Sequence, residues 1–149
     1  MQTVQGEPPS QQRNIGLSVL YSTGSPKINT KEQIKMTYEQ YYNAVSEIPS
    51  YTDPDAYASD VALSDIFAGT PDDQLPALFN DLRKLWDVWH MPLVDMRKIT
   101  GLSQAKFARR ILSSQRTIED WESGDRTPPI MTRFLIAGML GLLPEITID

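Results

Sequence analysis

The sequence contains no cysteine and a single histidine, His90, among its 149 residues. Without cysteine the chain has no disulfide framework, no thiolate nucleophile and no cysteine-based zinc site. No second histidine is present to complete a metal site, so a packed or surface imidazole beside Trp86 and Trp89 is the simpler interpretation of His90. We expect no metal, no cofactor and a reducing, cytoplasmic environment.

Long apolar runs are also missing. The N-terminal residues "MQTVQGEPPSQQRN" lack the basic start and the apolar stretch of a secretory signal. The most apolar segment, Phe134–Leu143, is ten residues long, whereas a membrane-spanning helix needs roughly 20. The sequence therefore predicts no membrane partner, and we interpret Phe134–Leu143 as a core helix.

Patterns typical of catalysis are absent as well: the sequence has no nucleophile elbow and no phosphate-binding glycine loop. The stretch "DPDAYASD" at residues 53–60 has the carboxylates of a calcium loop. However, Ala58 stands where such a loop needs glycine, and no terminal glutamate is correctly placed. Helix capping explains these carboxylates better. We do not expect an enzyme.

Positive charge is scarce in the N-terminal part of the chain. Residues 1–91 contain 6 Lys and Arg against 12 Asp and Glu, and the remaining residues contain 8 against 7. Within residues 97–126 the balance is basic, with 7 Lys and Arg against 4 Asp and Glu. An acidic N-terminal part and a locally basic C-terminal part indicate two different tasks.

Turn and cap signals divide the chain into three regions and predict an all-α fold of short helices. Residues 1–29 mix Pro and Gly with Gln, Ser and Thr, which predicts a flexible arm; within it "IGLSVLYST" is a candidate strand without an evident partner. Residues 30–91 predict an acidic helical region for oligomerisation or partner binding, and residues 92–149 a separate domain. The expected helices before this domain run from Thr30 to about Glu47, from Asp53 to Gly69, and from Thr70 onward with a kink or restart at Pro76.

The segment "GLSQAKFARRILSSQRTIEDWESGDRTPP", Gly101 to Pro129, predicts two short helices joined by a tight turn. Ser103 and Ser114 are suited to cap them, and Gly124 to end the second. We expect Ile118 and Trp121 to point inward and the polar side chains of the second helix to face solvent; these are Gln115, Arg116, Glu119 and Asp120. Such a helix pair fits the major groove of B-DNA.

These residues resemble the helix-turn-helix of the Cro and lambda-repressor family, also called the Xre type, over roughly Pro92 to Leu143. "TGLSQAKFARR", "RTIEDWESG" and "RTPP" are similar to small bacterial, phage and antitoxin regulators with a Trp-Glu pair after the recognition helix. The resemblance implies base contacts by Gln115, Arg116 and Asp120, and contacts to the DNA backbone by Gln104, Ser113, Ser114, Lys106 and Arg126, with Lys98, Arg109 and Arg110 as further candidates. It also implies a structural role for Arg97 paired with Glu122, and for Ile118, Trp121 and Gly124.

Two departures from the family pattern stand out. Leu112 and Ser113 occupy turn positions where the family usually has glycine and an apolar residue. Because positive φ is costly for a bulky residue, we expect a right-handed or lengthened turn. The family often has a fifth helix, and the helix with Trp86 and Trp89 is expected to replace it by packing on the other side.

The sequence thus predicts a DNA-binding transcriptional regulator that represses by occupying a palindromic operator in double-stranded DNA, as a homodimer. The apolar helix Ile130–Leu143 and the Trp86 face are the candidate dimer surfaces. The alternative is a protein-binding inhibitor or adaptor, of antitoxin or phage anti-defence type. In that case the acidic region 30–91 binds a protein partner and the helix-turn-helix serves autoregulation.

Overall fold

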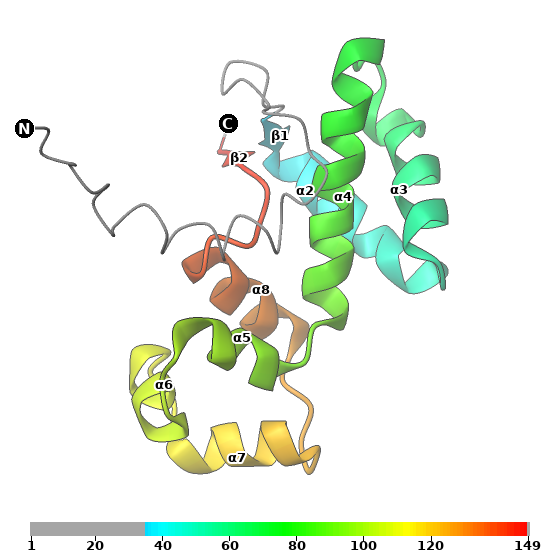
Figure 1. Cartoon of the computed structure of the whole chain (residues 1–149). Helices are drawn as coiled ribbons and strands as arrows, with labels where there is room; N and C mark the ends of the chain where they lie inside the picture. The colour runs from blue at the N-terminus through cyan, green and yellow to red at the C-terminus, as the bar shows by residue number, and fades with distance from the viewer. Residues whose placement is uncertain (1–34, 149) are drawn as a thin grey trace, which may run out of the picture. The chain divides into compact units, whose positions relative to one another are not determined.

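The computed structural model describes residues 35–148, and these residues form an all-α fold with one pair of two-residue strands (Figure 1). This confirms the predicted fold class. The elements are β1 (Met36–Thr37), α2 (Tyr38–Glu47), η3 (Ile48–Ser50), α3 (Pro54–Ala62), η4 (Asp65–Phe67), η5 (Asp72–Gln74), α4 (Leu75–His90), α5 (Leu93–Thr100), α6 (Gln104–Arg110), α7 (Gln115–Ser123), α8 (Ile130–Met139) and β2 (Ile146–Thr147). The expected arm at residues 1–29, its candidate strand and the Thr30 cap lie outside the described residues.

The first described helix begins later than the sequence predicts. Thr37, not Thr30, caps α2, since its hydroxyl accepts from the Gln40 amide at 3.1 Å and the Gln40 side chain accepts from the Thr37 amide at 2.9 Å. Just before this cap, Met36 is buried and pairs with Ile146 in the parallel β1–β2 ladder. The prediction of helix at residues 35–37 is wrong because this pairing holds the backbone extended.

Two later helix starts follow the predicted rules. The Asp53 carboxylate accepts from the Ala56 amide at 2.7 Å, and α3 begins at Pro54 as expected. α4 begins at Leu75 with Pro76 in its first turn, where a missing backbone N–H leaves no hydrogen bond unmade. Pro76 therefore marks a restart after η5. The predicted end of α3 at Gly69 is wrong, since α3 ends at Ala62.

The long helix α4 forms the centre of the core. Its Leu78, Leu82 and Leu85 side chains are fully buried, and α3 packs along it. From α3, the Tyr57 hydroxyl donates to the Ala44 carbonyl of α2 at 2.8 Å. Burial raises the pKa of Tyr57 far above its usual range, so this hydroxyl remains a donor at all physiological pH values.

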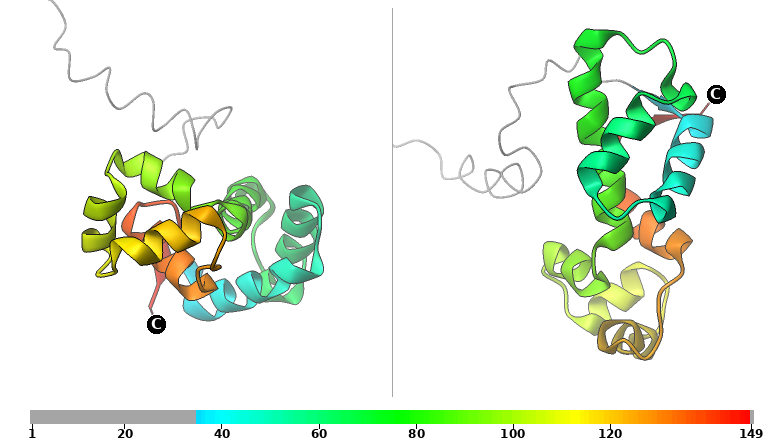
Figure 2. Two further views of the ribbon diagram at one scale, coloured as in Figure 1. Left: turned by 90° about the horizontal axis from the view of Figure 1, so that it is seen from below. Right: turned by 90° about the vertical axis from the view of Figure 1, so that its right-hand side faces the viewer.

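Helix α8 connects the C-terminal helices to α4. The Phe134 ring meets the Trp89 ring edge-on with 6.4 Å between centroids, and the Arg133 guanidinium donates to the Trp89 carbonyl. The helix with Trp86 and Trp89 thus packs against α8. That it replaces a fifth helix of the family by packing on the other side stays a prediction. Residues 35–148 belong to one compact unit, in which α7 lies at the edge away from α2 and α3 (Figures 1 and 2).

Candidate nucleic-acid interface

Helices α6 and α7 are short, and a serine side chain caps the N-terminus of each. The Ser103 hydroxyl accepts from the Lys106 amide at 3.3 Å, and the Ser114 hydroxyl accepts from the Thr117 amide at 3.1 Å. Phe107 and Ile118 are buried between α5, α6 and α7. The predicted caps are confirmed, and the Gly124 backbone ends α7 in the left-handed conformation with φ of 86°.

The turn between α6 and α7 corrects one expectation. Leu112 adopts φ of 56°, the left-handed conformation that glycine has in related turns, and not a right-handed or lengthened turn. Its amide donates to the Arg109 carbonyl at 3.2 Å, and the Ser113 amide donates to the Ala108 carbonyl at 2.8 Å. These bonds satisfy carbonyl groups at the end of α6, which offsets the strain at Leu112.

Because Leu112 is 95% exposed, its side chain contributes almost no burial while its backbone is strained. We expect Leu112→Gly to stabilise the protein by about 1 kcal/mol, since a non-glycine residue in the left-handed region costs roughly 1–2 kcal/mol and glycine's extra unfolded-state entropy takes back part of that gain. Urea unfolding of the two proteins measures the difference. Leu63→Gly, at an exposed position with φ of −92°, is the matched control and should not stabilise. A loss of stability in Leu112→Gly would contradict the strain argument.

Arg97 of α5 and Glu122 of α7 form the best-connected ion pair of the described residues. The Arg97 Nη2 lies 2.7 Å from Glu122 Oε1, its Nε donates to the same carboxylate, and its Nη1 donates to the Leu102 carbonyl at 3.0 Å. The hydrogen bond to Glu122 raises the pKa of Arg97 above its usual value. The predicted pair is confirmed, and it fixes α7 relative to α5.

The first turn of α7 presents two long polar side chains. The Gln115 amide nitrogen donates to the Glu119 carboxylate at 3.0 Å. The Arg116 side chain is 79% exposed, and its Nε lies 3.1 Å from the Asp120 carboxylate. Both side chains are thus solvent-facing, as the sequence predicts, and each is oriented by a carboxylate one helical turn further along α7.

Asp120 does not face solvent, which corrects the sequence-based expectation. It is only 9% exposed, and its carboxylate lies 3.1 Å from Arg116 Nε and 3.8 Å from Arg126 Nε. The loop after α7 folds back over it, because the Arg126 amide donates to the Asp120 carbonyl at 3.1 Å. That Asp120 reads bases stays a prediction; its geometry favours orienting two arginines, a role that the i,i+4 spacing from Arg116 already indicated.

Residues 93–145 match the model of the helix-turn-helix family. The matched family is of the Cro/C1 type and Xre-like, and the match lies in the C-terminal part of the chain. This match supports a DNA-binding regulator of the Xre type. The chain matches no curated protein and no solved structure.

The remaining predicted contacts of the helix-turn-helix domain occupy different settings. Lys106, Ser114 and Arg126 are exposed, whereas Gln104 and Ser113 are half-buried. The Gln104 amide nitrogen lies 3.5 Å from Glu122, so it joins the Arg97–Glu122 pair. Trp121 is half-buried at the edge of the core. Phosphate contacts by these residues stay predictions.

The described residues contain neither a metal-binding cluster nor a membrane-spanning helix. Within residues 35–148 no three His, Asp or Glu side chains are grouped so that they could hold a metal ion. No helix in that range combines the length and apolar character that crossing a bilayer requires.

Proposed function

We propose that the protein is a sequence-specific transcriptional repressor that binds a palindromic operator as a homodimer, with α7 in the major groove. The observation that carries this proposal is the exposure of Gln115 and Arg116 on the first turn of α7. The opposite side of the helix is fixed by the buried Ile118 and by the Arg97–Glu122 pair. A rigid helix with exposed planar polar groups at its N-terminal end has the features of a base reader.

The chemistry of the two side chains suits different bases. An amide can bond the adenine edge through two atoms, and a guanidinium can bond the guanine edge in the same bidentate way. The Asp120 carboxylate pairs with Arg116 and restricts its side chain, which lowers the entropy lost when it meets DNA. Lys106 and Arg126 on neighbouring segments would contact phosphates and set the register of the domain.

Selection from randomised duplex DNA by the purified protein at physiological salt tests this function. We expect enrichment of an inverted repeat whose half-sites lie about one helical turn, roughly 34 Å, apart. Enrichment of a single half-site would contradict the homodimer, and enrichment of no sequence would contradict base reading by α7.

The face between α2 and α8 supports the homodimer. A groove of about 630 Å³ lies there with no charged residue in its lining. Its lining includes Met131, Leu135 and Met139, which are 70%, 62% and 66% exposed and recur at one-turn spacing along α8. Two copies with a net charge of −5 repel each other, so they associate best over an uncharged apolar face.

We expect Leu135→Glu to weaken dimerisation by on the order of tenfold or more, because a carboxylate would be buried in an apolar interface. Sedimentation equilibrium of wild type and variant measures the change. Leu63→Glu is the matched control, since Leu63 is similarly exposed, at 69%, but lies at the end of α3. The α2–α8 interface is wrong if wild type is monomeric or if both variants dimerise equally well.

A second candidate function, binding of a basic protein partner, is favoured by one observation. Residues 36–82 contain nine Asp and Glu and no Lys or Arg, and all but Asp81 of these acidic residues are exposed. Such a surface attracts a basic partner and repels DNA. Binding of a defined basic partner that persists in Gln115→Ala, Arg116→Ala but is lost in Asp72→Asn, Asp73→Asn would support this function. Equal binding by both variants would contradict it.

A further inference from the structure

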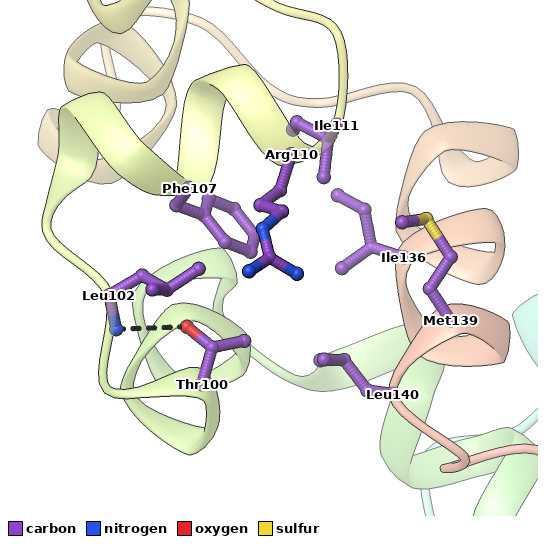
Figure 3. A pocket seen from close by; sticks show the side chains of 8 residues that line it. All are labelled: Thr100, Leu102, Phe107, Arg110, Ile111, Ile136, Met139 and Leu140. Atoms are coloured by element: carbon purple, nitrogen blue, oxygen red, sulfur yellow. Dashed lines mark hydrogen bonds between the residues drawn. The ribbon is translucent and has the colours of Figure 1, made fainter.

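A cavity of about 220 Å³ lies between α6 and α8, behind the helix pair that would dock on DNA. Its walls are mostly apolar, formed by Leu102, Phe107, Ile111, Ile136 and Leu140 (Figure 3). A cavity of about 150 Å³ with a similar lining is large enough for benzene in another protein. This cavity is therefore large enough for one ring, or a short branched chain, with a small polar group attached.

Arg110 is the only charged residue in the lining. Figure 3 shows its guanidinium lying among the apolar side chains, between Phe107 and Ile136. Within residues 35–148 the ion-paired arginines are Arg83, Arg97, Arg116 and Arg126, the other two ion pairs involve lysines, and none involves Arg110. Arg110 is exposed, and its guanidinium beside the apolar walls offers an anion a bidentate partner.

The other polar side chain of the lining is already occupied. The Thr100 hydroxyl donates to the Arg97 carbonyl and accepts from the Leu102 amide at 3.1 Å. A sugar or a nucleobase in this cavity would leave most of its polar groups without partners, which is costly. The lining thus suits a ligand with one anionic group and an otherwise apolar body.

We propose that the cavity is a binding site for a small amphipathic monocarboxylate. Its carboxylate pairs with the Arg110 guanidinium, and its apolar body packs against Phe107 and Ile136. Because Arg110 belongs to α6 of the helix-turn-helix domain, the bound carboxylate neutralises one positive charge on the DNA-facing module. By lowering the positive potential of this module, the ligand weakens DNA binding. This consequence rests on the proposed function, whereas ligand binding itself does not.

Binding is tested with the full chain and no DNA, using benzoate and hexanoate as probes and calorimetric titration as the measurement. Benzyl alcohol and hexanol are neutral analogues of matching shape, and inorganic phosphate is an anion without an apolar body. We expect one of the carboxylates to bind at least tenfold more tightly than its alcohol and than phosphate. No carboxylate binding up to about 10 mM would overturn the proposal. Equal binding of carboxylate and alcohol, or of carboxylate and phosphate, would overturn it as well.

The matched variants are Arg110→Gln and Arg109→Gln. Each removes one positive charge from an exposed position on α6, but only Arg110 lines the cavity. We expect Arg110→Gln to weaken carboxylate binding at least tenfold and Arg109→Gln to leave it unchanged; equal loss in both would indicate a general charge effect and overturn the site. Titration of the selected operator with and without carboxylate then tests regulation. If the carboxylate binds but no operator sequence is selected, the proposed function is contradicted while the ligand site remains supported.

Discussion

Replacing Gln115 and Arg116 together with alanine is expected to abolish sequence-specific DNA binding. A good bidentate contact to a base edge contributes about 1–3 kcal/mol of discrimination, so loss of two contacts costs roughly 2–6 kcal/mol. The variant should therefore bind the selected operator no more tightly than unrelated DNA of the same length. Fluorescence anisotropy titrations at physiological salt, with operator and with scrambled duplex, measure this ratio.

The fold should survive this double substitution, because both side chains are exposed and their partners are on the same helix. Loss of two such intrahelical pairs costs only about 1 kcal/mol. Asn80→Ala, Arg83→Ala is the matched control, since it removes an amide and a guanidinium from exposed positions on α4. The control should bind the operator as wild type does. Undiminished operator preference in Gln115→Ala, Arg116→Ala would show that α7 is not the reading helix.

Short-range signals account for most of what the sequence predicts correctly. Asp53, Ser103 and Ser114 each cap a helix whose first turn lies within three residues, so local sequence determines the outcome. The N-terminal cap of α2 shows the limit of prediction from local sequence. Thr30 and Thr37 are each followed three residues later by glutamine, and the choice of Thr37 goes with the pairing of Met36 to Ile146, distant in the sequence. No local rule contains that pairing.

In the candidate site, too, some features could be predicted from the sequence and others depend on tertiary packing. The exposed positions of Gln115 and Arg116 follow from helical periodicity, and the Arg97–Glu122 pair follows from the family resemblance. The burial of Asp120 depends on how the loop carrying Arg126 folds back, which periodicity does not describe. Leu112 takes the left-handed conformation against its own preference because the bonds that end α6 require it. The cavity beside Arg110 arises from the distance between α6 and α8 and has no sequence signature.

Removing the guanidinium of Arg97 is expected to cause a large loss of stability. The Arg97 and Glu122 side chains are only 19% and 9% exposed. In Arg97→Met the carboxylate would keep only the Gln104 amide, 3.5 Å away, and the Leu102 carbonyl would lose its donor. Breaking one half of a buried pair costs about 3–5 kcal/mol, a large fraction of the 5–15 kcal/mol typical of a domain. Urea unfolding at neutral pH measures the loss.

Arg83→Met is the matched control for Arg97→Met, because Arg83 also pairs with a carboxylate, that of Asp55, but their side chains are 48% and 72% exposed. An exposed pair contributes only about 0–1 kcal/mol, since water screens the charges and solvates the partner that remains. Adding Glu122→Met to Arg97→Met should recover part of the loss, because it removes the unpaired buried carboxylate. Equal losses in the two single variants would mean that Glu122 reaches water once Arg97 is gone. In that case the pair would not be what holds α7 against α5, and the rigidity of the reading helix would have to come from Ile118 and the packing around it.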